Sequence, residues 1–187
     1  MSNGKLFVIS GASGVGKGTV LKRVMELRDD LHFSVSATTR GPRPNEIDGV
    51  HYYFITREQF REMIDNNEFL EYDDHAANYY GTPRGQAEEK RARGHVLFDI
   101  DPNGAKQLKA SCPDATLIFI MPPSVEELER RLRGRHDTSE EQIRLRMERA
   151  VWEMEQRFWY DHVVVNDQVE DCAKEIFDII SAVADTN

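Results

Sequence analysis

The sequence lacks an apolar run long enough to cross a lipid bilayer. Such a span needs about 20 consecutive apolar residues, and no stretch of these 187 residues approaches that length. The first residues also lack the basic start, long apolar stretch and small-residue cleavage site of a secretory signal. We therefore expect a cytoplasmic protein with no membrane partner.

Cysteine and basic charge are also scarce. The two cysteines, Cys112 and Cys172, and the six histidines show no metal-ligand or redox spacing, which suits a reducing cytoplasm. Lys and Arg number 24 against 33 Asp and Glu, so the formal net charge is −9. A general nucleic-acid binder needs an excess of basic residues, so we expect no nucleic-acid partner; a local basic cluster can still bind a small anion.

Short apolar runs alternate with segments of helical periodicity in most of the chain. The runs predicted as strands are residues 5–10, 95–100, 115–121 and 162–166. The segments predicted as helices are residues 17–28, 84–93, 124–133, 139–158 and 171–184. Strands that alternate with helices predict an α/β fold, with a parallel sheet that is flanked by helices on both faces.

Polar residues at a spacing of three predict several helix starts. The pairs with the spacing of a capping box are Thr56 with Gln59, Ser124 with Glu127, and Ser139 with Gln142. The apolar face predicted for the helix after Ser139 consists of Ile143, Met147, Ala150, Val151, Met154 and Phe158. The segment 101–104, by contrast, reads Asp-Pro-Asn-Gly and has the composition of a turn.

The pattern changes between about residues 33 and 85. Short β-like pieces occur there at residues 33–37, 52–55 and 69–72, with one amphipathic helix after Thr56. We interpret this segment as an inserted, β-rich subdomain.

Residues 11–19 read GASGVGKGT and connect the first predicted strand to the first predicted helix. Consecutive backbone N–H groups in such a loop form a concave anion site, and the following helix adds its positive N-terminal dipole. A lysine in the loop bridges the outer phosphates of a nucleotide. The residues expected to bind these phosphates are Gly11, Ala12, Ser13, Gly14, Val15, Gly16, Lys17, Gly18 and Thr19.

The loop departs from the strict P-loop pattern at one position. That pattern has Ser or Thr directly after the lysine, whereas this sequence has Gly18, with Thr19 next. Thr19 is therefore the expected hydroxyl for a phosphate or for the metal shell. A glycine-rich turn without a chemical role and a dinucleotide-binding loop are the alternatives; the lysine disfavours both, and the G-x-x-G-x-G spacing disfavours the second.

A second basic site follows in a proline-rich loop. Arg40 and Arg43 lie three residues apart and can grip one phosphate together, to which Tyr52 can add a hydroxyl donor. Arginines that are merely solvated loop charges are the simpler alternative.

Residues 38–54 fit the pattern T-T-R-x-x-R-x-x-E-x-x-G-x-x-Y-x-F, which resembles the signature of the guanylate kinase family. Residues 69–71, 78–82, 99–101, 130–135 and 165–167 match further motifs in the family's order, so the resemblance covers nearly the whole chain. It implies a P-loop kinase fold and the reaction ATP + GMP → ADP + GDP, with Mg²⁺ as cofactor and dGMP as a second acceptor.

The resemblance also implies how a single domain, residues 1–187, is divided. A CORE would comprise about residues 1–33, 84–124 and 160–187. A GMP-binding subdomain would comprise about residues 34–83, and a helical LID about residues 125–159.

Individual roles follow from the same resemblance. The residues expected to hold the GMP phosphate are Arg40, Arg43, Tyr52 and Tyr80. Those expected to read guanine are Ser36, Glu71, Thr82 and Asp101. Those expected to act on the transferring phosphoryl group are Lys17, Arg40, Arg131, Arg135 and Arg146. Asn166 is expected near the adenine of ATP, and Thr19 and Asp99 near Mg²⁺, with Asp99 acting through water.

Physical chemistry supports a base-reading role for Glu71. Guanine presents N1–H and N2–H₂ side by side, and one carboxylate can accept from both. Adenine has no such donor pair, so it would leave a buried carboxylate unpaired, which can discriminate on the order of 10⁴-fold. The alternative is a solvent-facing carboxylate on an edge strand.

Seven arginines lie between residues 130 and 149 of this acidic chain. They either pair with nearby glutamates on helix surfaces or belong to a LID that delivers arginines to the phosphoryl group. No general base is required, because the attacking phosphate of GMP is already anionic near neutral pH.

Two other functions stay open at this point. One is a kinase of the same scaffold that acts on another phosphorylated acceptor, such as a ribosyl phosphate; the set Ser36, Glu71 and Thr82 disfavours it. The other is a non-catalytic module that binds protein partners; the set Lys17, Arg40, Arg43 and Arg135 disfavours it. The sequence leaves the oligomeric state open, and a homo-oligomer is one of the alternatives.

Overall fold

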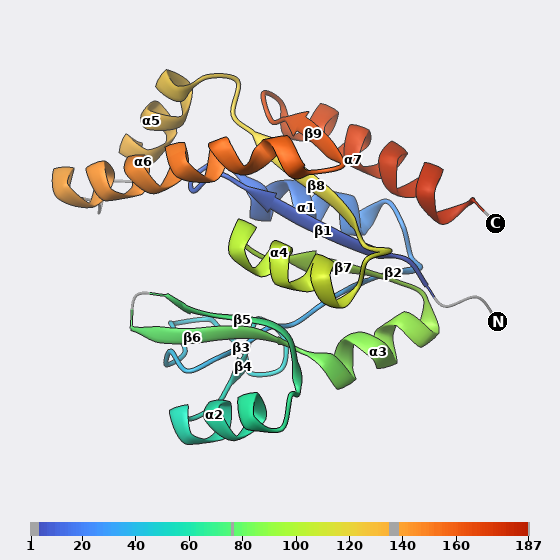
Figure 1. The fold of residues 1–187 in the computed structure, drawn as a ribbon. Coiled ribbons are helices and arrows are strands. Elements are labelled where there is room, and N and C mark those ends of the chain that lie inside the picture. The colour runs from blue at the N-terminus through green and yellow to red at the C-terminus, as the bar shows by residue number, and fades with distance from the viewer. Residues whose placement is uncertain (1–3, 76, 135–138, 187) are drawn as a thin grey trace.

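A central sheet of five parallel strands organises the structure, a computed structural model that describes residues 4–75, 77–134 and 139–186 (Figure 1). The strands follow the order β2-β7-β1-β8-β9. Their bounds are β1 Leu6–Gly11, β2 Leu31–Phe33, β7 His95–Asp99, β8 Thr116–Met121 and β9 His162–Val165. The predicted α/β class with a parallel sheet is confirmed.

Helices cover both faces of this sheet. On one face lie α1 Lys17–Glu26, α5 Val125–Arg133, α6 Glu140–Glu155 and α7 Val169–Ala184. On the other lie α3 Arg84–Arg93 and α4 Pro102–Ser111. Alternate residues of β1 face opposite layers: Phe7 and Ile9 pack into the first core, and Leu6 and Val8 into the second. Burial on both faces explains why β1 reads as one apolar run.

A smaller, four-stranded sheet lies beside the central one, in the lower part of Figure 1. Its order is β4-β3-β6-β5, and its strands are β3 Ala37–Thr38, β4 Tyr53–Phe54, β5 Phe69–His75 and β6 Asn78–Pro83. Helix α2 Arg57–Asp65 packs on it through the buried Phe60, whose ring stacks on that of Phe69 with centroids 4.3 Å apart. The β-rich character predicted between residues 33 and 85 is thus observed.

The structures predicted for residues 33–37 and 101–104 were wrong. Residues 33–37 do not form one strand: β2 ends at Phe33 in the central sheet, and β3 begins at Ala37 in the smaller one. The segment 101–104 is not an isolated turn but the start of α4. Asp101 is its N-cap, accepting from the backbone N–H of Gly104 at 2.9 Å, and Pro102 occupies the first turn, where its missing N–H is tolerated.

The predicted capping boxes form at Thr56 and Ser139. At Ser124 the side chain accepts from the backbone N–H of Glu127 at 3.1 Å, but the Glu127 carboxylate accepts from Arg130 and Arg131 instead of returning the bond.

The apolar face predicted for residues 139–158 extends too far. Val151 is 41% exposed and Phe158 is 78% exposed. The helix ends at Glu155, and a short 3₁₀ helix, η1 Gln156–Trp159, follows it. In the part of the chain that the structure describes, no helix is long and apolar enough to cross a membrane.

Candidate functional site

The loop between β1 and α1 lines a cavity of about 570 Å³. All nine residues of the predicted phosphate loop, 11–19, border it, together with Tyr52, Asp101, Arg149 and Glu153. Gly14 and Gly16 have φ of 90° and 93°, in the left-handed region that favours glycine. The loop therefore has the backbone conformation that its glycines predict.

Lys17 and Asp99 form an ion pair beside this cavity, between Nζ and Oδ1. Thr19 lies on the rim and is exposed, and nothing lies within 4 Å of where a Cβ atom on Gly18 would be. The three predicted groups Lys17, Thr19 and Asp99 are thus neighbours of the loop, and the lysine ammonium neutralises the aspartate.

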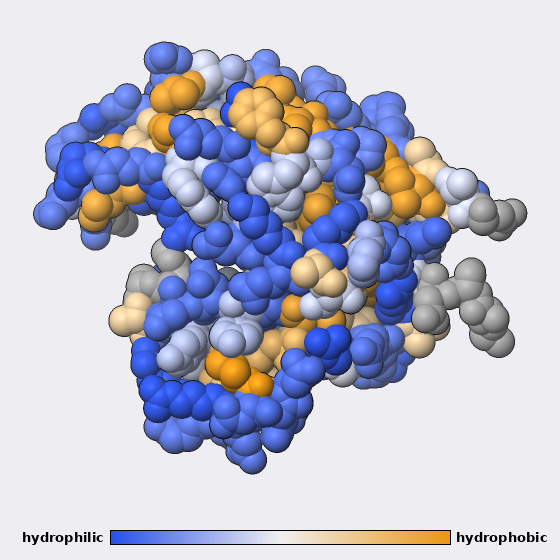
Figure 2. All heavy atoms as spheres, viewed as in Figure 1, coloured by the Kyte–Doolittle hydropathy of each residue, from blue (hydrophilic) through white to orange (hydrophobic). Residues whose placement is uncertain are grey.

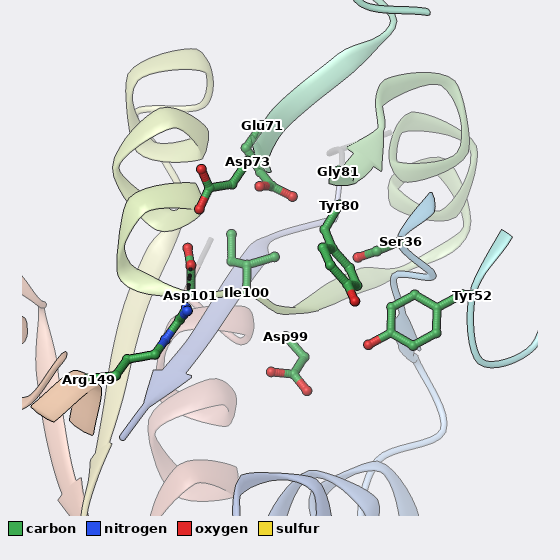
Figure 3. Close-up of a pocket in the computed structure, with 10 residues that line it drawn as sticks. All are labelled: Ser36, Tyr52, Glu71, Asp73, Tyr80, Gly81, Asp99, Ile100, Asp101 and Arg149. Atoms are coloured by element: carbon green, nitrogen blue, oxygen red, sulfur yellow. Dashed lines mark hydrogen bonds and ion pairs between the residues drawn. The ribbon is translucent and has the colours of Figure 1, made fainter. Parts of the chain in front are cut away.

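A second cavity, of about 180 Å³, lies between β5 and β6 and the carboxyl end of β7 (Figure 3). The residues that line it are Ser36, Tyr52, Glu71, Asp73, Tyr80, Gly81, Asp99, Ile100, Asp101 and Arg149. Five of them were predicted as acceptor-site residues: Ser36, Tyr52, Glu71, Tyr80 and Asp101. Tyr52, Asp101 and Arg149 border both cavities, so the two adjoin.

The molecule is hollowed on the same side. Figure 2 shows a hollow between the part that carries α5 and α6 and the four-stranded sheet, with mainly hydrophilic residues at its rim. A polar recess of this kind suits charged ligands.

Glu71 of β5 is buried, with 6% of its surface exposed. The pKa of its carboxyl group is raised to about 7, chiefly by burial and also by the negative charges of Asp101 and Asp73. The hydrogen bond from the Thr82 hydroxyl acts in the opposite direction, because it favours the ionised form. The Thr82 Oγ1 to Glu71 Oε1 distance is 2.5 Å. Thr82 is itself fully buried behind this carboxylate and is not among the described residues that line the cavity.

Arg40 is not among the described residues that line either cavity, but it contacts two that line the second one, Tyr52 and Tyr80. Its two Nη atoms donate to the two carboxylate oxygens of Glu46, each at 2.9 Å, and its guanidinium lies 5.4 Å from the centre of the Tyr52 ring. The ion pair lowers the pKa of Glu46 to about 2, and Arg40 also hydrogen-bonds Tyr80. Burial raises the pKa of the Tyr52 hydroxyl above its usual value. Glu46 thus orients the arginine beside two tyrosines.

Arg43 is placed differently. Its side chain is exposed, its backbone N–H donates to Glu46 Oε2 at 2.7 Å, and it is not among the described residues around either cavity. The structure therefore does not bring Arg43 together with the other predicted acceptor-site residues.

The predicted LID arginines divide into several kinds. Arg146 lies over the phosphate loop, with Nε 3.4 Å from the Ser13 hydroxyl. Arg131 donates to the carbonyls of Val15 and Asn166 at 3.3 and 3.0 Å, so it braces the loop from outside the cavity. Arg135 lies outside the described residues.

Two other arginines of this region pair with nearby glutamates, which was the first alternative for the cluster. Arg130 pairs with Glu127, and Arg133 pairs with Glu129 and Glu140 on the helix surface.

Asn166 lies directly after β9 and is 2% exposed. Its side-chain amide donates to the Val15 carbonyl at 2.8 Å, and its backbone N–H donates to the Met121 carbonyl. This side chain thus supports the phosphate loop from beneath; its predicted contact with adenine stays a prediction.

Glu153 and Arg149, which were not predicted as site residues, connect the two cavities. Glu153 is 4% exposed, and its Oε2 accepts from the backbone N–H of Ser13 at 2.7 Å. Arg149 donates from Nε to Glu153 Oε1 at 2.8 Å and from Nη2 to Asp101 Oδ2 at 3.1 Å. A sequence signal existed: Glu153 follows Ala150 by three residues and precedes Met154 on the apolar face of α6, where a carboxylate needs a partner.

Comparison with known sequences matches residues 3–183 to the family model for guanylate kinase. The chain is 47% identical over 180 residues to a guanylate kinase of Thermus thermophilus, a match that covers 96% of this chain and 81% of the relative. It is 46% identical over 183 residues to the guanylate kinase of Carboxydothermus hydrogenoformans, covering 97% and 90%.

Comparison with solved structures agrees. The crystal structure of guanylate kinase from Anaplasma phagocytophilum superposes with a TM-score of 0.81 at 32% identity, covering 100% of this chain and 89% of that one. A gluconokinase from Sinorhizobium meliloti gives a TM-score of 0.52 at 16% identity, covering 99% and 96%, which is a likeness of fold alone.

Proposed function

This chain belongs to the guanylate kinase family and is a kinase, and from that premise we propose that it transfers the γ-phosphoryl group of ATP to GMP. An oxygen of the GMP phosphate attacks the γ-phosphorus, the bond to the oxygen that bridges the β- and γ-phosphorus breaks, and ADP leaves with that electron pair. The second pKa of a phosphate monoester is about 6, so the nucleophile is ionised near neutral pH without a base.

One observation carries the proposal: the two cavities share Tyr52, Asp101 and Arg149 as a common border. A phosphate loop on one side and the buried carboxylate of Glu71 on the other suit a triphosphate donor and a guanine acceptor whose phosphates meet at the border. Holding the two reacting groups close and aligned supplies much of the catalysis in phosphoryl transfer.

On the donor side we assign the phosphates of ATP to the backbone N–H groups of residues 11–19 and to Lys17. The lysine would exchange its ion pair with Asp99 for contact with the outer phosphates. Arg146, already against Ser13, would stabilise charge on the transferring group. We assign the same role to Arg131 and Arg135, although Arg131 donates to the Val15 carbonyl of the loop in this structure.

On the acceptor side we assign guanine to Glu71, Asp101, Ser36 and Thr82. The carboxylate of Glu71 accepts from N1–H and N2–H₂, and a hydroxyl donates to O6. The GMP phosphate is assigned to a separate group: Arg40, Arg43, Tyr52 and Tyr80. Arg43 would have to turn inward from its exposed position, so its part in this set depends on closure of the loop around GMP.

Mg²⁺ fits the donor groups beside the loop. Among the residues that the structure describes, no group of three or more His, Cys, Asp and Glu side chains is arranged to hold a metal ion, and Mg²⁺ in kinases is held largely by phosphates and one or two oxygen ligands. We assign Asp99 and the Thr19 hydroxyl as those ligands, Asp99 through water. When bound, Mg²⁺ neutralises charge on the phosphate oxygens.

We further propose that residues 34–83 form the GMP-binding part, residues 125–159 the LID, and the remainder the CORE. The hollow between α6 and the four-stranded sheet is the space that such parts would close (Figure 2). Closure would exclude water and so limit hydrolysis of ATP. We also propose dGMP as an acceptor, a cytoplasmic location and a part in purine nucleotide recycling.

Product analysis tests the proposal. Incubation with ATP, GMP and Mg²⁺ should convert the two nucleotides to ADP and GDP in equal amounts, resolved by anion-exchange chromatography. Release of inorganic phosphate without GDP would contradict it. Equal turnover of a ribosyl phosphate in place of GMP would favour the other acceptor class.

A further inference from the structure

A continuous series of contacts connects the two cavities through helix α6. It begins at the phosphate loop, where the backbone N–H of Ser13 donates to Glu153. It continues through Arg149, which donates to Glu153 with Nε and to Asp101 with Nη2; Figure 3 shows the second contact. One arginine thus holds a carboxylate of each cavity with two different nitrogens of its guanidinium.

The series extends to the base-reading carboxylate. The other oxygen of Asp101, Oδ1, accepts from the backbone N–H of Gly104 and so fixes the start of α4. Gly104 packs directly against Glu71, because a Cβ atom at this position would lie 2.6 Å from Glu71 Oε2. A displacement of Asp101 therefore reaches both the guanine side and, through Arg149, the phosphate loop.

Glu153 has no role in the reaction proposed above, yet it is nearly as buried as the core around it. A buried carboxylate needs charged or hydrogen-bonding partners, and here Ser13 and Arg149 are such partners. The pair Arg149–Glu153 also spans one turn of α6, at positions i and i+4, so the helix itself fixes the distance between the two contacts.

We propose that Arg149, acting with Glu153, is a positioning residue that couples occupation of the acceptor cavity to the phosphate loop. The inference deepens the proposed function and rests on it. Guanine bound at Asp101 and Glu71 fixes Asp101, which fixes Arg149; Arg149 then holds Glu153 against the Ser13 amide and orders the loop before ATP arrives. By thermodynamic reciprocity, each nucleotide tightens the other by the same factor.

Isothermal titration calorimetry measures this coupling directly. The Mg²⁺ complex of adenylyl imidodiphosphate is titrated into the protein with and without saturating GMP. We expect GMP to tighten binding of the analogue about 5-fold or more in the parent, a typical size for coupled sites, and less than about 2-fold in Arg149→Ala. Arg149→Lys keeps the charge but loses the planar guanidinium that reaches both carboxylates, so it should retain an intermediate coupling. This variant also tests the proposal if the alanine variant folds poorly.

Arg144→Ala is the matched control. Arg144 lies on the same helix, is exposed, and pairs with Glu148, so its variant should couple the two nucleotides as the parent does. Parental coupling in Arg149→Ala, or binding of both nucleotides by the parent without coupling, would overturn the inference and leave the proposed function intact. Tighter binding of the analogue by Glu153→Gln would also overturn it, because Glu153 would then compete with phosphate. No binding of GMP by the parent would instead refute the proposed function.

Discussion

Thr82 and Glu71 stand directly opposite each other on the antiparallel strands β6 and β5, and the Thr82 hydroxyl donates to the carboxylate at 2.5 Å. Burial favours the neutral form of Glu71, whereas this hydrogen bond favours the ionised form that guanine requires. The register of two short strands therefore tunes the group to which we assign recognition of the base.

The first prediction concerns pH. Because the pKa of Glu71 is raised to about 7, a falling pH protonates it, and a neutral carboxyl can no longer accept from both N1–H and N2–H₂. The KM for GMP should therefore rise as pH falls from about 8 to about 6, by roughly tenfold for one unit below the pKa. Initial rates at saturating ATP measure this.

The phosphate of GMP titrates in the same range, so a control is needed. Glu71→Gln keeps the shape of the side chain and removes its titration, and the pH dependence that disappears in this variant belongs to Glu71. Identical pH profiles for parent and variant would show that Glu71 does not control GMP binding.

The second prediction follows from the hydroxyl of Thr82. Thr82→Val removes a donor to the ionised carboxylate, so the pKa of Glu71 rises further, and the midpoint of the GMP-binding profile moves to higher pH. A hydrogen bond to a charged group contributes about 1.5–3 kcal/mol, which corresponds to a shift of roughly one to two pH units. Thr82→Ser, which keeps the hydroxyl, should stay near the parent; equal profiles for Val and Ser variants would refute the role.

The third prediction uses two glycines near helix starts. A Cβ atom on Gly104 would lie 2.6 Å from Glu71 Oε2, whereas one on Gly18 would meet nothing within 4 Å. Gly104→Ala should therefore displace the Glu71 carboxylate and raise the KM for GMP about tenfold or more, the loss expected of one good hydrogen bond to a charged group, with little change in the KM for ATP.

Gly18→Ala is the matched substitution at the start of α1. It should leave both KM values near those of the parent and stabilise the fold by up to about 1 kcal/mol, since alanine favours a helix over glycine. Chemical denaturation measures the stability. A GMP-specific loss in Gly18→Ala, or none in Gly104→Ala, would contradict this account of the acceptor cavity.

The fourth prediction tests the donor side. Lys17→Met should lower kcat by about 10² or more, the usual loss when one charge-stabilising group is removed from a transition state, while GMP binding changes little. Lys22 is exposed on the same helix, and Lys22→Met should turn over as the parent does. Parental kcat in Lys17→Met would remove Lys17 from the catalytic group.

Much of the fold could be predicted from local sequence patterns. Strands buried on both faces read as apolar runs, as in β1, and the caps at Thr56 and Ser139 mark helix starts because the side chains that satisfy the backbone are local. Helix α4 was missed because Asp-Pro-Asn-Gly favours a turn as strongly as it favours an N-cap followed by proline.

The residues of the site also fall into two groups, those that local sequence patterns predict and those that they do not. The phosphate loop and four of the five predicted acceptor-site residues around the second cavity, all but Ser36, belong to contiguous motifs that are visible in the sequence; their roles stay predictions. The role of Arg149 and Glu153 depends on packing of α6 over a loop some 140 residues away, at Ser13. The placement of Asn166 beneath Val15 is likewise set by neighbouring strands, which no local pattern encodes.

The central claim, a GMP-specific kinase whose Glu71 reads guanine, is tested most directly by comparing kcat/KM for GMP and AMP in the parent and in Glu71→Gln. Adenine lacks the donor pair that guanine offers to the buried carboxylate, so the parent should prefer GMP on the order of 10⁴-fold. Glu71→Gln should lose most of that preference, because its kcat/KM for GMP falls. Comparable values for GMP and AMP in the parent, or an unchanged preference in the variant, would contradict the claim.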